Sequence, residues 1–163
     1  MALVRRFLST IAILSALLAA ACATTQRSPG LTEAQKETLR AEGFVPTAEG
    51  WAFGIADKLL FPVDESEIDI SQRKVIERIT KALLAVGITA LNVEGHTDDT
   101  GGADYNIRLS RQRADAVAEV IIATGMPREN MRIVGLGTAH PVQPNTTPEG
   151  RQENRRVVMI VSN

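Results

Sequence analysis

Residues 93–114, VEGHTDDTGGADYNIRLSRQRA, constrain the fold more than any other stretch of the chain. They combine a strand, a polar glycine-rich loop and the beginning of a helix. The strand is expected over residues 88–97 and the helix over 104–124, where a glycine and a proline then end it. This order predicts a fold in which helices pack against a sheet.

The expected helix carries three polar side chains on its apolar face. At about 100° per residue, Asn106, Ser110 and Arg113 project beside Val117. A buried arginine keeps its charge, so it needs an anionic partner or access to water. Asp98 in the loop and the amides at the helix start would complete a polar pocket for an ammonium and a carboxylate, as in an amino-acid head group. An internal salt bridge between Asp98 and Arg113 explains the pattern equally well.

Residues 1–21 are expected to be a signal peptide. Two arginines precede an apolar run over residues 7–18, which is shorter than the roughly 20 residues that a membrane span needs. Small residues then lead to Cys22, the only cysteine, in a pattern that resembles a bacterial lipobox. Lipidation of Cys22 is favoured over an ordinary cleavage that leaves a free thiol, because no disulfide partner exists. Ala23 after the cysteine resembles lipoproteins that are sent to the outer membrane.

Removing residues 1–21 leaves 16 basic and 19 acidic residues, a formal charge of −3. This balance argues against a nucleic-acid partner. Residues 22–50 are expected to be the lipidated cysteine and a linker. A short helix over 31–42, with Thr32 and Gln35 as a capping box, competes there with a disordered tether. Residues 51–163 would form one folded domain.

The periodicity within that domain predicts the order β-α-β-α-β-β. A first strand is expected over 51–61, an amphipathic helix begins after Asp69 or Ser71, and VVMIV at 157–161 is apolar on both faces, as in a central strand. The expected fold class is therefore α+β: a two-layer sandwich with a mixed four-stranded sheet and both main helices on one face.

Two groups of spaced residues resemble the OmpA-like peptidoglycan-binding domain over about residues 52–162. The first group is Gly95-His96-Thr97-Asp98, Gly101, Asn106, Leu109-Ser110, Arg113-Ala114 and Val117. The second is Gly135, Gly137, Pro141, Asn145, Thr147, Gly150-Arg151 and Asn154-Arg155-Arg156-Val157. So many spaced matches are more specific than a single short motif.

The resemblance implies non-covalent binding of the diaminopimelate residue of the peptidoglycan stem peptide. Asp98 would meet its ammonium group and Arg113 its carboxylate. The resemblance also places three residues around the pocket and one in a bordering loop: Thr97, Asn106, Leu109 and Asp64. Pro62 and Val63 replace a Phe-Asp-x-Asp type of sequence in that loop. With a lipid anchor, the chain is similar to Pal-type lipoproteins, which implies an outer-membrane location with the domain in the periplasm.

The remaining polar candidates are expected to be structural. Arg151, Asn154, Arg155 and Arg156 are interpreted as loop-fixing or strand-edge residues rather than a glycan-binding patch. His96 and His140 lack the spacing of zinc ligands, so neither a metal nor another cofactor is expected.

Two other classes of function remain as alternatives. The residues argue against an enzyme acting on the cell wall, because acids that face an arginine stay ionised, whereas glycosidases need one carboxyl with a raised pKa. The second alternative is an OmpA-fold interaction module of an envelope complex that no longer binds peptidoglycan.

Overall fold

The computed structural model describes residues 30–54 and 60–163, so the predicted signal peptide and Cys22 lie outside the described residues. The elements follow the order α1 (Glu33–Glu42), β1 (Val45–Thr47), β2 (Gly50–Phe53), α2 (Ile70–Ala85), β3 (Leu91–Gly95), α3 (Ala103–Ala123), the 3-10 turn η1 (Arg128–Asn130), β4 (Met131–Gly135), α4 (Pro148–Asn154) and β5 (Val157–Val161). Within this part of the chain, none of the helices is both long and apolar enough to cross a membrane.

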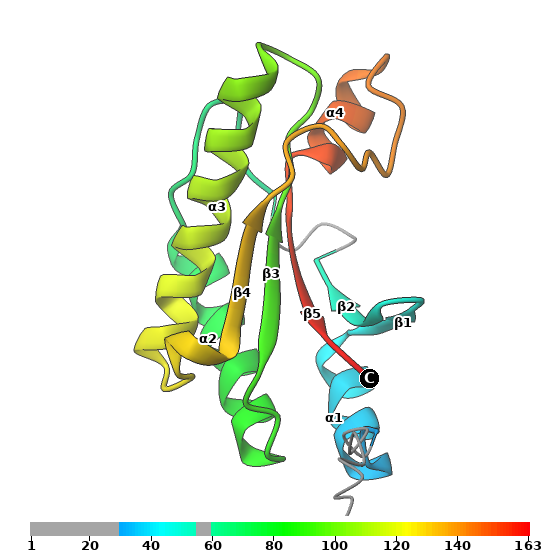
Figure 1. Ribbon diagram of the computed structural model, residues 1–163, viewed down its shortest axis with the longest axis vertical. Coiled ribbons are helices and arrows are strands. Elements are labelled where there is room, and N and C mark those ends of the chain that lie inside the picture. The colour runs from blue at the N-terminus through cyan, green and yellow to red at the C-terminus, as the bar shows by residue number, and fades with distance from the viewer. Residues whose placement is uncertain (1–29, 55–59) are drawn as a thin grey trace, which may run out of the picture.

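The strands form one mixed sheet in the order β1-β2-β5-β3-β4 (Figure 1). β3 runs parallel to β4 and antiparallel to β5. All five residues of β5 are buried, which confirms its predicted central position. The α+β fold class is confirmed, and the described sheet has five strands where four were expected.

The additional strand comes from the hairpin of β1 and β2. The expected single strand over 51–61 ends at Phe53, because Gly54 takes a positive φ of 106° that most residues avoid. β1 lies upstream of residue 51 and pairs with β2, so part of the expected linker belongs to the sheet. Leu60 makes an isolated bridge to Arg156.

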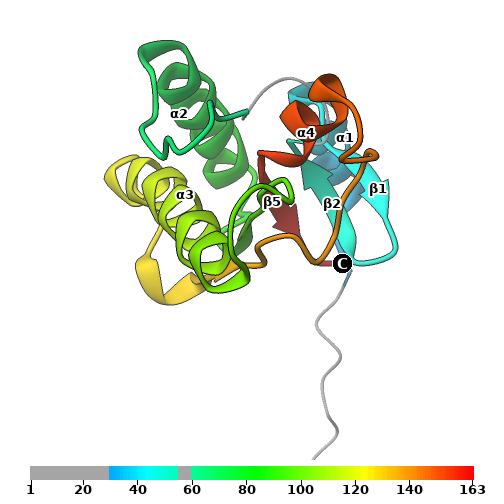
Figure 2. The ribbon, with the colours of Figure 1, turned by 90° about the horizontal axis from the view of Figure 1, so that it is seen from above.

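Helices α2 and α3 lie side by side on one face of the sheet (Figures 1 and 2). α2 begins with the predicted Asp69 cap. The expected helix over 104–124 is also confirmed, and α3 approaches β3 closely because Gly95 has no side chain. A Cβ atom at Gly95 would lie 1.8 Å from the carbonyl oxygen of Ser110. This inner face and the helices enclose the main hydrophobic core.

The expected linker, residues 22–50, also contributes to the core through α1. The capping box of Thr32 and Gln35 starts α1, which confirms the predicted short helix. α1 packs against α2, and its Leu39 is fully buried in the main core. On the other face of the sheet, Ala52, Val158 and Ile160 form a separate small apolar cluster.

Candidate functional site

The residues predicted to form the site gather at one end of the molecule, where β3 leads into the loop before α3 (Figure 1). The chain stays paired beyond the end of β3. His96 donates its backbone N–H to Arg156, and Thr97 donates its own to Gly137. These bonds hold the beginning of the loop firmly against the sheet.

Arg113 is fully buried and bound to backbone carbonyls. Its Nε donates to Glu65 at 2.8 Å, Nη1 to His96 at 3.2 Å and Nη2 to Pro62 at 2.8 Å. The guanidinium carbon lies 5.2 Å from the centre of the Phe61 ring, close enough for a cation–π contact. Burial lowers the pKa of Arg113 to about 10, so the side chain remains charged at neutral pH.

Asp98 pairs with Arg155 and not with Arg113. Its Oδ2 accepts from Arg155 Nη1 at 2.8 Å, and its Oδ1 accepts from the Thr100 amide at 3.0 Å. Burial favours a higher pKa for Asp98, but these hydrogen bonds outweigh it and hold the pKa below its ordinary value. The expected alternative of an internal Asp98–Arg113 salt bridge is therefore wrong. The sequence reasoning also missed Arg155 as the partner, since the two residues are far apart in the chain.

The polar residues on the inner face of α3 have different partners. Asn106 donates from Nδ2 to the Thr100 carbonyl at 3.0 Å and so holds the loop against the helix. Ser110 donates to Ile107 and accepts from the Gly137 amide, both at 2.9 Å. Ser110 therefore ties α3 to the segment after β4, whereas Asn106 supports the predicted site.

The other predicted site residues line the same end of the fold. Thr97 and Leu109 are buried, and within the described part of the chain the Thr97 hydroxyl has no hydrogen-bond partner. Asp64 is exposed and takes a positive φ of 57°, and its Oδ1 accepts from the Tyr105 hydroxyl at 3.1 Å. The loop around Asp64 thus reaches the first turn of α3, and the Pro62 and Glu65 carbonyls from this loop bind Arg113.

The residues around α4 confirm the predicted structural role for Asn154. Its Oδ1 accepts from the amides of Val142 and Gln143, and its Nδ2 donates to Gln143 and to the Asn145 side chain. Arg151 donates to the Asn145 carbonyl at 2.7 Å. These bonds hold the long segment between β4 and α4 in place.

A cavity of about 570 Å³ opens beside Arg155. It lies between the segment after Leu60, the beginning of α2 and the end of α4, and its lining includes Phe61, Pro62 and Glu65. Phe61 contacts Arg113, and Pro62 and Glu65 bind it through their carbonyls. The site is therefore next to open space large enough for part of a ligand.

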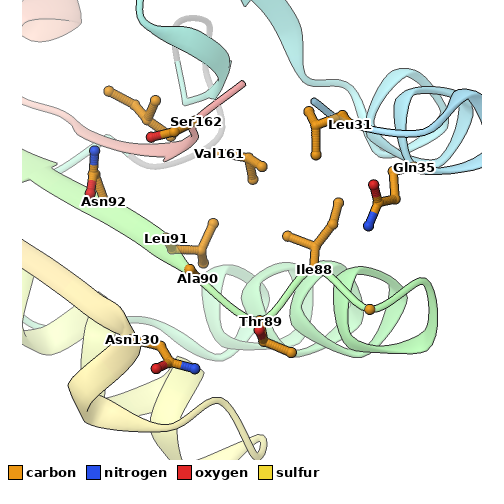
Figure 3. Close-up of a pocket in the computed structure, with 12 residues that line it drawn as sticks. Leu31, Gln35, Ile88, Thr89, Ala90, Leu91, Asn92, Asn130, Val161 and Ser162 are labelled. Atoms are coloured by element: carbon orange, nitrogen blue, oxygen red, sulfur yellow. The ribbon is translucent and has the colours of Figure 1, made fainter. Parts of the chain in front are cut away.

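A second pocket lies where α1 meets the sheet (Figure 3). Leu31 and Gln35 face Ile88 and Val161 across it, and the side-chain Nε2 of Gln35 donates to the Val86 carbonyl at 3.1 Å. Its lining residues carry no charged side chain, so it offers little for recognising an ionic ligand. Among the described residues no group of three or more His, Cys, Asp or Glu side chains is placed to hold a metal ion.

Comparison with known proteins identifies the fold and the family. Residues 60–155 match the OmpA family model. The chain is 41% identical to the outer-membrane lipoprotein YfiB of Pseudomonas aeruginosa, over 94% of this chain and 92% of the relative. It is 37% identical to the peptidoglycan-binding protein ArfA of Mycobacterium tuberculosis, over 68% of this chain and 32% of ArfA.

A solved structure, the cell wall anchor of the T6SS from Pseudomonas aeruginosa, superposes with a TM-score of 0.62 at 25% identity. The match covers 83% of this chain and 99% of the anchor. By name, these relatives are an outer-membrane lipoprotein, a peptidoglycan-binding protein and a cell wall anchor, in agreement with the expectation that this chain is not an enzyme. The chain belongs to the OmpA family.

Proposed function

We propose that this protein is a lipid-anchored envelope protein that binds peptidoglycan non-covalently through the diaminopimelate of the stem peptide. The observation that carries the proposal is the state of Arg113. Its guanidinium is fully buried and charged, yet among the described residues no carboxylate lies within ion-pair distance of it. Backbone carbonyls alone offset part of the cost of burying this charge. A carboxylate ligand would supply the missing anion.

The donors for such a ligand are in place. A guanidinium has five N–H groups, and three of those on Arg113 are used by carbonyls, which leaves two for a carboxylate. The carbonyl bonds also fix the orientation of the guanidinium before the ligand arrives. The entropy cost of ordering this side chain on binding is therefore small.

Asp98 supplies the complementary charge for an ammonium group. It is ionised at neutral pH because the Arg155 and Thr100 hydrogen bonds lower its pKa. A carboxylate has about four lone-pair sites, and two are used here. An ammonium can thus bind Asp98 without displacing Arg155. The pair of Asp98 and Arg113 matches the two charged ends of an amino-acid head group.

The affinity of one site is expected to be modest. Charge-assisted hydrogen bonds contribute about 1.5–3 kcal/mol each. Retention at the wall then depends on many equivalent stem peptides and on an anchor that keeps the domain close to them. A lipid on Cys22 in the outer membrane would provide this anchor, in line with the outer-membrane lipoprotein name of the Pseudomonas relative. Mass spectrometry of the mature N-terminus tests it: a diacylglyceryl-modified Cys22 is expected, and an unmodified thiol would contradict it.

Sacculus pull-down of the mature protein tests the ligand. We expect binding that free diaminopimelate competes away, and loss of binding in Asp98→Asn. The matched control is Asp99→Asn, an adjacent exposed acid that is expected to bind like the wild type. Circular dichroism checks that both variants fold. A folded Asp98→Asn that binds sacculi normally would refute the assigned residue, and a wild type that never binds would favour the protein-interaction module.

A further inference from the structure

The outer face of the sheet carries a second group of polar side chains. It lies at the same end of the strands as Arg113 but on the opposite side of the sheet. The register pairs Glu94 with Val158, and its continuation sets His96 opposite Arg156. Because side chains alternate between faces, these four residues share one face, and Val93 and Met159 project to the main core.

A cavity of about 390 Å³ lies over this face. Glu94, His96 and Arg156 form the polar end of the strands in this cavity, Glu49 and His140 add polar groups from the walls, and Val158 and Ile160 form an apolar floor. The turn after β1 and the segment after β4 form its walls, and none of its lining residues comes from a helix. The volume is within the usual range for small-molecule sites.

Two buried polar groups at this end have no partner among the described residues. Arg156 is 4% exposed, and its Nε is unbonded. Its Nη1 reaches the Asn154 carbonyl only at 3.5 Å, and Nη2 reaches that of His140 at 3.2 Å. His96 is 3% exposed, and its Nδ1 is also unbonded. Buried polar groups usually have hydrogen-bond partners, so these two groups are available to a ligand that enters the cavity.

The charges indicate which ligand. Arg156 has no carboxylate within ion-pair distance among the described residues, and its free Nε–H suits a carboxylate. The half-buried Glu94, two residues along the strand from His96, suits an ammonium group. The apolar floor beyond them suits an aliphatic or aromatic side chain.

From this arrangement we infer that the outer-face cavity is a binding site for an apolar α-amino acid. Arg156 and the His96 Nδ1 position hold its carboxylate, Glu94 holds its ammonium group, and Val158 and Ile160 contact its side chain. This site is separate from the one proposed for peptidoglycan, because the sheet lies between them.

Calorimetric titration of the mature protein with L-leucine tests the inference, alongside two analogues. Leucinamide lacks the carboxylate and 4-methylpentanoate lacks the ammonium group. We expect leucine to bind, and each analogue to bind roughly tenfold to a hundredfold more weakly, as the loss of a charge-assisted hydrogen bond implies. Failure of leucine to bind at millimolar concentration, or equal binding of all three compounds, would overturn the inference.

Variants assign the binding to this cavity. Glu94→Gln should bind leucine and 4-methylpentanoate with similar affinity and still discriminate against leucinamide. Arg108→Gln changes an exposed charge on α3, outside the cavity lining, so it should bind leucine like the wild type. If Glu94→Gln keeps the full preference for leucine over 4-methylpentanoate, the assignment is wrong.

A crossed experiment separates the two sites. Asp98→Asn should lose sacculus binding and keep leucine binding. Glu94→Gln should bind sacculi normally and lose the preference for leucine over 4-methylpentanoate. If Asp98→Asn abolishes leucine binding, leucine occupies the peptidoglycan site and the outer-face assignment is refuted. Failure of sacculus binding alone would refute only the proposed function.

Discussion

The two faces of the sheet each carry a buried arginine, and the two arginines differ in their hydrogen bonds. On the inner face, Arg113 makes three hydrogen bonds of 2.8–3.2 Å to carbonyls and lies against an aromatic ring. On the outer face, Arg156 makes two bonds of 3.2 and 3.5 Å, and its Nε is unbonded within the described residues. Burial lowers both pKa values to about 10, so both side chains are charged.

The difference follows from what covers each face. The inner face is closed by α3, which approaches so closely that only glycine fits at Gly95. The outer face lies under a cavity rather than a helix. On the closed face, three N–H groups of the arginine organise the backbone, whereas on the open face the arginine Nε–H has no partner among the described residues. The same residue type is therefore held firmly by short hydrogen bonds on one side and by fewer, longer ones on the other.

The largest effect is expected for Arg113→Ala. This change leaves three buried carbonyls without their donor, so we expect the free energy of unfolding to fall by about 3–5 kcal/mol. Urea denaturation followed by circular dichroism measures it. Arg108→Ala, on the exposed side of α3, is the control and should change stability by less than about 0.5 kcal/mol. A similar small change for Arg113→Ala would contradict its role as a scaffold.

Gly95→Ala tests how tightly the inner face is closed. The new methyl group would overlap the Ser110 carbonyl, so α3 must move away from β3 at a cost of about 3 kcal/mol. Thermal and urea unfolding provide the measurement. A Cβ at Gly102 meets nothing within 4 Å, so Gly102→Ala should cost less than about 1 kcal/mol. Equal stability of the two variants would show that β3 and α3 can accommodate a methyl group at position 95.

Arg156→Ala should lower the free energy of unfolding by about 1–2 kcal/mol, which is less than for Arg113→Ala. The hydrogen bonds of Arg156 are longer and fewer. The same urea denaturation compares the two variants directly. If the order of the two costs is reversed, Arg156 is a scaffold residue and the distinction between the faces fails.

The smallest effect concerns His96 and pH. Burial, followed by the nearby Arg156, lowers the pKa of His96 to about 3 from 6.5. Between these values the unfolded chain binds a proton that the folded chain does not, so stability falls as the pH drops below 6.5. The loss is about 1.4 kcal/mol by pH 5.5. His96→Asn should remove this loss in urea denaturation at pH 8 and pH 5.5.

The comparison uses His96→Asn and the wild type, because His140 lines the same cavity and itself contributes to the lowered pKa of His96. Asp98 on the inner face does not interfere, because its lowered pKa makes its contribution fall only as the pH drops below about 3.8. An unchanged pH dependence in His96→Asn would mean that His96 is hydrated in solution and that the outer-face cavity is wetter than its burial indicates.

Local sequence signals predicted several elements correctly. The capping residues Thr32 and Asp69 mark the beginnings of α1 and α2, because a side-chain oxygen bonds the free amides of the first turn. The 3.6-residue period placed Asn106 and Arg113 on the buried side of α3, where the structure has them. The apolar VVMIV run identified β5 as a central strand.

Other features depended on contacts between distant segments. The hairpin of β1 and β2 was missed, because two short strands around a turn resemble a linker followed by one strand. α4 was also missed within a segment rich in proline and asparagine, although Thr147 caps it and Pro148 begins it. Periodicity carries little information about segments as short as these.

The sequence by itself determined that one arginine would be buried on α3, because helical periodicity is a property of neighbouring residues. Only the tertiary structure decided its partners: carbonyls from the segment after Leu60 and from His96 bind Arg113, and Arg155, 57 positions away, binds Asp98. A hydrogen bond needs two groups within about 3 Å, and chain folding, rather than local pattern, sets that distance. For the same reason, the outer-face cavity appears only once β3 and β5 are paired.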